Sequence, residues 1–214
     1  MPEGDPLDAV LIGGREKVAV VVVAYDPSWP ARYAELEARV RGALGDTALR
    51  IEHIGSTSVP GLAAKPIIDV LVVVADVTDE EAFVPPLEAV GLQLRVREPD
   101  HRMMRTPGRT AHVHFYAPGH EAIAAYLDFR DRLRADDADR DLYAATKREL
   151  AQRDWKDVNE YAEAKSEVVA GILARARARS MRAVEAREKG PNGLATRPPR
   201  GTTLKGQGLP PPSP

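Results

Sequence analysis

The sequence contains no cysteine. This absence excludes structural disulfides and thiolate metal ligands, and it fits a reducing compartment, so we expect a cytoplasmic protein. Long apolar runs are also missing, because the longest, residues 18–24, is far shorter than the roughly 20 residues that span a bilayer. The N-terminus has no basic start followed by an apolar stretch, so we expect no secretory signal and no membrane partner.

Charge of one sign is not in excess either. The 30 lysines and arginines nearly balance 32 aspartates and glutamates, giving a net charge of −2 and no strong signal for nucleic acid. The length of 214 residues suffices for one domain with extensions. We expect a loose leader at residues 1–17, one domain at 18–180, and a disordered tail rich in Gly and Pro at 188–214.

Hydrophobic periodicity predicts a sheet core and several helices. The predicted strands are residues 18–24, 49–55, 67–74, 92–98, 101–106 and 111–117. A helix is predicted over residues 26–45, with Asp26 as N-cap and Pro27 at the first helical position. Residues 79–91 are helical in character but contain Pro85 and Pro86, which must kink or split the helix. Three helices are expected between residues 120 and 179.

One stretch, HIGSTSVPGLAAKPIIDVLV at residues 53–72, concentrates polar groups at the start of an apolar strand. Gly55 permits close approach of the backbone to a ligand, and the N–H groups and hydroxyls of Ser56 and Thr57 can cradle a phosphate. Lys65 can reach the same phosphate or pair with Asp69. The alternative stays open that the glycines and Pro60 only shape the exit of a strand.

Asp69 and the histidines form a second candidate group. Asp69 interrupts an apolar strand, where an unpaired charge costs several kcal/mol to bury, so it requires a cation or a donor. His112 and His114 share one face of a strand, because side chains repeat every two residues, and can bind one metal ion together with Asp69. All five histidines lie between residues 53 and 120, which makes His53 a further candidate. Structural alternatives remain: an ion pair for Asp69, and a sheet face with two satisfied histidines.

Several blocks of sequence resemble, in order, those of the GrpB family. They are YDPSWP, RIEHIGSTSVPGLAAKPIIDVLV, DHRMMR, HVHFY, YLDFRDRLRAD, and YAATKRELA followed by YAEAKSEVV. This family is similar to the domain fused behind dephospho-CoA kinase in some bacteria. The resemblance covers residues 18–173 and implies a nucleotidyltransferase-like fold of the α+β class, with a mixed β-sheet flanked by helices.

In the nucleotidyltransferase superfamily, a Gly-Ser turn holds a triphosphate and a following strand presents two carboxylates that carry magnesium. Gly55 and Ser56 match the turn, and Asp69 matches the first carboxylate. Leu71 stands where the resemblance places the second carboxylate. The carboxylate pair is therefore incomplete, and imidazole substitutes from a neighbouring strand would suit Zn, Mn or Fe better than Mg.

Two functional hypotheses follow. The first is a metal-dependent nucleotidyltransferase-like enzyme whose ligand is a nucleotide or a phosphorylated small molecule. Its expected residues are Asp69 and His53 for catalysis, Gly55, Ser56, Thr57 and Lys65 for phosphate, and Asp69, His112 and His114 for a divalent metal. The second is a noncatalytic module for regulation or folding assistance that retains the fold. The first hypothesis requires an imidazole nitrogen within about 5 Å of an Asp69 carboxylate oxygen.

The composition of the tail yields a direct prediction. A chain truncated after Arg187 should keep a melting temperature close to that of the full chain, because a segment so poor in apolar residues buries little surface. Thermal unfolding of the two chains tests this. A drop of many degrees on truncation would show that the tail packs on the domain.

Overall fold

The computed structural model describes residues 6–17 and 19–188. Its centre is a five-stranded sheet with the strand order β1-β2-β5-β4-β3. The strands are β1 (Arg50–Ile54), β2 (Ile68–Val73), β3 (Gln93–Glu98), β4 (His101–Arg105) and β5 (Ala111–Tyr116). β2 and β5 run parallel, whereas the other neighbouring pairs are antiparallel. The mixed sheet and the α+β class are as the sequence predicts.

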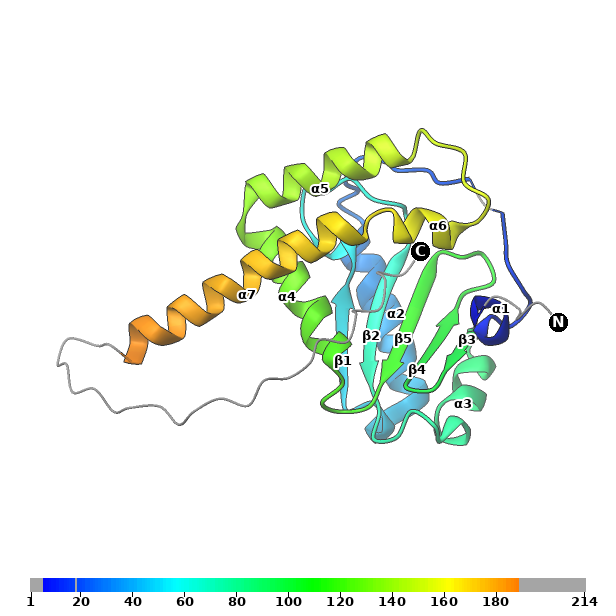
Figure 1. Ribbon diagram of the computed structural model, residues 1–214. Helices are drawn as coiled ribbons and strands as arrows, with labels where there is room; N and C mark the ends of the chain where they lie inside the picture. The colour runs from blue at the N-terminus through cyan, green and yellow to red at the C-terminus, as the bar shows by residue number, and fades with distance from the viewer. Residues whose placement is uncertain (1–5, 18, 189–214) are drawn as a thin grey trace.

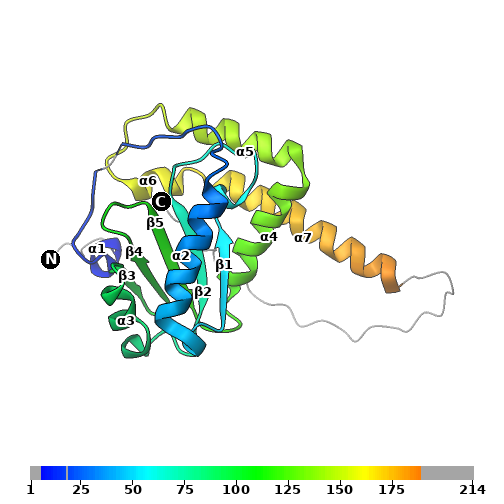
Figure 2. The same cartoon turned by 180° about the vertical axis from the view of Figure 1, so that it is seen from behind.

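Helices α2 (Trp29–Leu44) and α3 (Val84–Ala89) cover one face of this sheet (Figures 1 and 2). The helical spacing of Leu36, Val40 and Leu44 buries all three against the strands, as predicted. The proline pair lies in the first turn of α3, where a missing N–H costs nothing, so the predicted helix is split rather than kinked. The short 3₁₀ turn η3 (Glu80–Ala82) is the other piece.

The opposite face meets α4 (Glu121–Ala135), which packs Ala122 against Ile54, Leu71 and Tyr116. Beyond α4 the chain continues through α5 (Asp137–Leu150), α6 (Val158–Glu163) and α7 (Ser166–Glu188). A separate apolar cluster joins α4, α5 and α7 to Val59 and Leu62 of the β1–β2 connection. These helices therefore lie over the end of the sheet where β2 and β5 begin, while the far end of α7 extends past the sheet (Figure 1).

Two predicted elements differ from the structure at the N-terminal side. Of residues 19–24, only Val23 pairs with another backbone, in a single bridge to Ala64, and Val21 is 57% exposed. The predicted strand is wrong because an apolar run becomes a strand only where a partner strand lies alongside, and here only a loop does. The N-cap is also wrong: the carboxylate of Asp26 accepts from the Ser28 N–H in a turn, and α2 begins after Ser28.

The C-terminal region contains four helices within the described residues, where three were expected. Two breaks fall at the predicted places, and a third break, at Ala164 and Lys165, separates the additional helix α6 from α7. Asp136 and Asp157 cap the helices that follow them, because each side chain accepts from the N–H of a residue in the first turn. Aspartates at both breaks were thus the local signal for a helix start.

The predicted leader is partly helical, and the predicted tail is not described. Within the predicted leader, α1 (Pro6–Val10) is helical and Leu11 forms a bridge with Val96. The predicted disordered tail from residue 189 onward lies outside the described residues, and the domain limits stay predictions. In the described part of the chain, no helix has both the length and the apolar character needed to cross a membrane.

Candidate functional site

The candidate site is a cleft at the end of the sheet where β1 ends and β2 and β5 begin. Its walls come from the turn after β1, the starts of β2 and β5, and the helical layer of α4, α5 and α6. The polar residues that line it include Ser56, Lys65, Asp69, His114, Lys147 and Lys165. Side chains from both halves of the chain therefore meet in one place.

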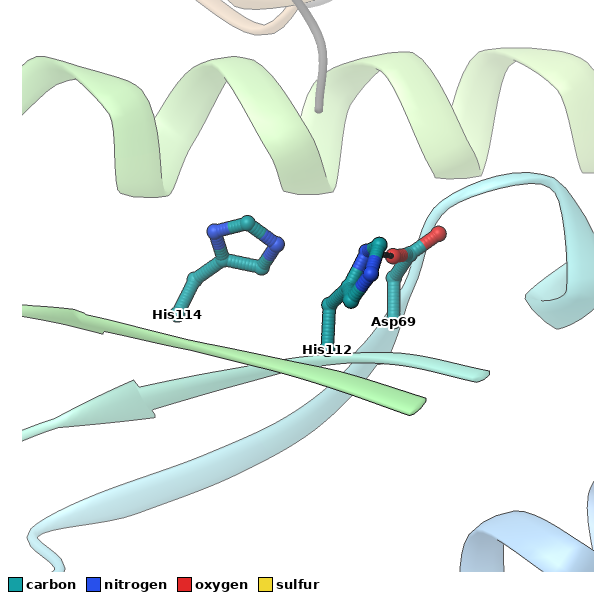
Figure 3. A group of neighbouring side chains, drawn as sticks. All are labelled: Asp69, His112 and His114. Atoms are coloured by element: carbon teal, nitrogen blue, oxygen red, sulfur yellow. Dashed lines mark ion pairs between the residues drawn. The ribbon is translucent and has the colours of Figure 1, made fainter. Parts of the chain in front are cut away.

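Asp69, His112 and His114 project from two neighbouring strands to the same side of the sheet (Figure 3). The parallel register places Asp69 opposite His112 and Leu71 opposite His114. The Nδ1 atom of His112 lies 3.5 Å from Oδ1 of Asp69, and one ligand atom from each of the three residues lies within 4.8 Å of the others. The distance predicted between imidazole and Asp69 is thus met.

Two atoms of this group are buried without a hydrogen-bond partner. They are Oδ1 of Asp69 and Nδ1 of His112, which have no partner among the described residues. Such atoms are costly in a folded protein and require an explanation, of which an ion is one. Two imidazole nitrogens and one carboxylate oxygen form a donor set typical of Zn, Mn or Fe. The residues therefore fit a divalent transition metal better than Mg²⁺.

His114 is completely enclosed, with 1% of its surface exposed. Burial lowers the pKa of His114 well below its usual value, and the adjacent His101 and His112 lower it further. The ring is therefore neutral, which is the form that binds metals. Its Nδ1 atom lies 3.0 Å from Nε2 of His101, and its other ring nitrogen faces His112 in Figure 3.

Gly55 brings the backbone of the turn directly against Asp69. Its φ of +68° is a left-handed conformation, and a Cβ at this position would lie 2.3 Å from Oδ2 of Asp69. The turn continues as η2 (Ser56–Ser58), in which the Ser58 hydroxyl donates to the Gly55 carbonyl at 2.6 Å. Only glycine fits here, because any other residue would displace the carboxylate.

Thr57 lines the cleft, whereas His53 does not. Ile54 is opposite Asp69 across β1 and β2, so His53 lies on the other face, where it stacks on Tyr33 of α2 with ring centroids 4.4 Å apart. The Thr57 hydroxyl donates to the Ile67 carbonyl and lies 3.1 Å from Nε2 of His53. Burial lowers the pKa of His53 to about 4, so His53 is a neutral, hydrogen-bonded core residue. The catalytic role of His53 has no geometric support.

Two lysines that the sequence reasoning missed also enter the cleft. Nζ of Lys147 donates to Oγ of Ser56 at 2.9 Å and to the Ala63 carbonyl. Lys165 lies over the ring of Tyr161 at 4.7 Å, and Lys65 lies over the same ring at 5.2 Å. Lys147 and Lys165 are each 3% exposed. The turn and three lysines thus surround one small volume.

A repeated spacing was the available signal for these lysines. In YAATK and YAEAK a lysine follows a tyrosine by four residues, which places both on one helical face. Nζ of Lys147 lies 4.5 Å from the centroid of the Tyr143 ring, and Lys165 pairs likewise with Tyr161. A buried lysine needs such a partner, whereas a surface lysine does not.

The charge of the cleft is strongly one-sided. Burial lowers the pKa of Lys65 to about 8 and that of Lys165 to about 7, and the pKa of Lys147 falls well below its usual value. Asp69 is the acidic group that opposes these shifts, and none of the three lysines forms an ion pair with another described residue. The cleft therefore favours an anion, because a bound anion restores the charge that burial disfavours.

Comparison with known proteins identifies the class. A family described as GrpB protein matches residues 19–175. A UPF0157 protein of Streptomyces coelicolor is 51% identical over 166 residues, which are 78% of this chain and 89% of the relative. The crystal structure of conserved protein GrpB from Enterococcus faecalis is 32% identical, with a TM-score of 0.68 over 75% of this chain and 99% of that one.

The chain therefore belongs to the GrpB family, and the resemblance seen in the sequence is confirmed. A dephospho-CoA kinase of Mycolicibacterium paratuberculosis is 32% identical over 68% of this chain, a match that spans 43% of the kinase. The Cid1 poly(U) polymerase with MgGTP bound is 16% identical with a TM-score of 0.46. A likeness at that level says nothing about activity.

The close contact of Gly55 with Asp69 can be tested by comparing two glycines. Gly61 has a similar φ of +78°, but a Cβ there would meet nothing within 4 Å. Gly61→Ala should lower the free energy of unfolding by about 1 kcal/mol through backbone strain alone. Gly55→Ala should cost at least about 2 kcal/mol more, because the methyl group also displaces Asp69. Equal losses in urea unfolding would show that the turn does not hold the carboxylate.

Proposed function

We propose that this GrpB-family chain binds a nucleotide or another phosphorylated small molecule beside a divalent cation, and transfers its nucleotidyl or phosphoryl group to the oxygen of a hydroxyl acceptor or of water, with the rest of the ligand as the leaving group. The observation that carries this proposal is the convergence of three lysines, of which Lys147 and Lys165 are buried, and the Gly55–Ser56 turn on the cleft that also contains Asp69 and His114. An anion site and a candidate metal site thus share one wall. We place this activity in the cytoplasm.

The anion half of the site is argued from charge and donors. Lys65 and Lys165 line the cleft and form no ion pair with a described residue, and Lys147 donates to the Ser56 hydroxyl. Charge-assisted hydrogen bonds to phosphate oxygens are short and strong, and they would replace the lost hydration of these ammonium groups. Phosphate esters carry the dense negative charge that such a cluster selects.

The metal half rests on the two unsatisfied atoms. Asp69 and His112 each present one buried atom that forms no hydrogen bond, these two atoms lie 3.5 Å apart as an ion pair, and His114 completes the group. A divalent cation held by these residues would supply Lewis-acid activation of a phosphoryl oxygen. The lysines would hold the rest of the ligand and neutralise charge, and the enclosing helices α4, α5 and α6 would restrict water.

A second candidate function has an observation of its own. Leu71 of β2 is fully buried in the apolar cluster with Ile54 and Tyr116, so this position supplies no second carboxylate for a metal. A site that binds the ligand without transfer would be a regulatory or folding-assistance module. Incubation with a nucleoside triphosphate and Mn²⁺ or Zn²⁺ separates the two: release of pyrophosphate or phosphate supports the enzyme, and recovery of intact ligand supports the module.

Binding of each ligand alone tests the two halves of the site. Calorimetric titrations would use Mn²⁺ or Zn²⁺ in one series and pyrophosphate in the other. Asp69→Asn should abolish metal binding and leave pyrophosphate binding in place, because the amide keeps the shape but loses the charge. Lys165→Met should weaken pyrophosphate binding at least about tenfold through the lost ammonium, without affecting the metal.

The matched control is Lys156→Met, at a side chain that is 90% exposed and outside the cleft, and it should change neither titration. Equal pyrophosphate affinity in Lys165→Met and the wild type would contradict the anion site. If Asp69 is only a structural ion-pair partner, Asp69→Asn should instead destabilise the protein by roughly 3 kcal/mol or more. A stable variant that still binds metal would exclude Asp69 as an essential ligand.

A further inference from the structure

Two polar side chains outside the cleft, Glu98 and His101, connect to His114. Glu98 is the last residue of β3 and His101 is the first residue of β4. Oε2 of Glu98 lies 2.6 Å from Nδ1 of His101, and Nε2 of His101 lies 3.0 Å from Nδ1 of His114. The three side chains form a continuous line from the surface to the buried imidazole.

The direction of the hydrogen bonds in this line follows from its outer end. The hydrogen bond from His101 holds the pKa of Glu98 below its usual range, so Glu98 is a carboxylate that only accepts. Nδ1 of His101 then donates to Glu98, and in an imidazole whose one N–H is used in this way Nε2 is the acceptor. The proton between the two rings therefore belongs to Nδ1 of His114, and Nε2 of His114 carries the lone pair.

The orientation of the rings is fixed by stacking. The ring of His101 lies against Tyr116 with centroids 4.7 Å apart and planes 12° from parallel, and its plane is 9° from that of His114. Exposure falls along the line: the side chain of Glu98 is 41% exposed, that of His101 is 14% exposed, and His114 is 1% exposed as a residue. The outer members can thus be changed with little effect on the core.

We propose that Glu98 and His101 are positioning residues that hold His114 in the Nδ1–H tautomer, with the Nε2 lone pair directed at the site shared with Asp69 and His112. The inference rests on the proposed function for the metal, but the tautomer itself exists without metal. Histidines that bind metals commonly donate their other N–H to such a partner, which fixes the ring and raises its basicity.

The tautomer is measured by ¹⁵N NMR of the ring nitrogens of His114 in the metal-free protein. The wild type should show a protonated Nδ1 and an unprotonated Nε2. His101→Phe keeps a ring against Tyr116 but removes the acceptor, so the proton of His114 should move to Nε2. Glu98→Gln, at a half-exposed position, should give a mixture, because the amide can accept from or donate to His101.

Metal affinity is the second readout. Titration with Zn²⁺ should give a dissociation constant about 10- to 100-fold weaker for His101→Phe than for the wild type, with Glu98→Gln in between. The matched control is His120→Asn. The ring of His120 stacks on Tyr116, with centroids 4.6 Å apart, and its side chain caps α4 by accepting from the Ala122 N–H. Asparagine keeps the cap, so tautomer and affinity should stay at wild-type values.

The results separate this inference from the proposed function. An Nε2–H tautomer in the wild type, or a tautomer and affinity unchanged in His101→Phe, would overturn the positioning role. Absence of Zn²⁺ binding in the wild type would overturn the metal half of the proposed function, whereas the tautomers of the wild type and the variants would still decide the role of Glu98 and His101.

Discussion

The half-buried carboxylate of Asp69 is the constraint around which the site is built. One of its oxygens leaves no room for a side chain at residue 55, and the other lies beside His112 without a hydrogen bond. Its charge also supports protonation of Lys65, Lys147 and Lys165, whose pKa values burial would otherwise lower further. A glycine turn, an imidazole pair and a lysine cluster are therefore all arranged with respect to one carboxylate.

The topology explains how so many polar groups become buried together. The parallel pairing of β2 with β5 aligns the starts of two strands, and this alignment sets Asp69 opposite His112. Lys147 comes from α5 and Lys165 from the link between α6 and α7, whereas Lys65 belongs to the β1–β2 connection. The helical layer is held to this connection through Val59 and Leu62. Apolar contacts on either side of the cleft thus stabilise a polar centre that would be unfavourable by itself. An anion and a cation bound side by side would relieve both kinds of unfavourable charge.

The sequence predicted the elements of the sheet well, because the five strands of the structure have clear apolar patterns and turn residues between them. It also predicted that an imidazole would meet Asp69, since HVH repeats with the period of a strand. Residues 18–24 were predicted incorrectly because composition shows apolar character but not the presence of a partner strand. The face occupied by His53 depended on the register of β1 against β2, which a single sequence does not supply. Lys147 and Lys165 required knowledge of which helical face is buried.

The central claim is that one cleft holds a divalent cation and a phosphate-like anion side by side. Diffraction from crystals grown with Mn²⁺ and pyrophosphate, recorded with the anomalous signal of manganese, tests it most directly. We expect an anomalous peak at about 2.0–2.3 Å from Asp69 Oδ1, His112 Nδ1 and His114 Nε2, with pyrophosphate oxygens within hydrogen-bond distance of Lys65 and Lys165. Manganese bound elsewhere, or a cleft that contains only water beside a direct Asp69–His112 hydrogen bond, would contradict it.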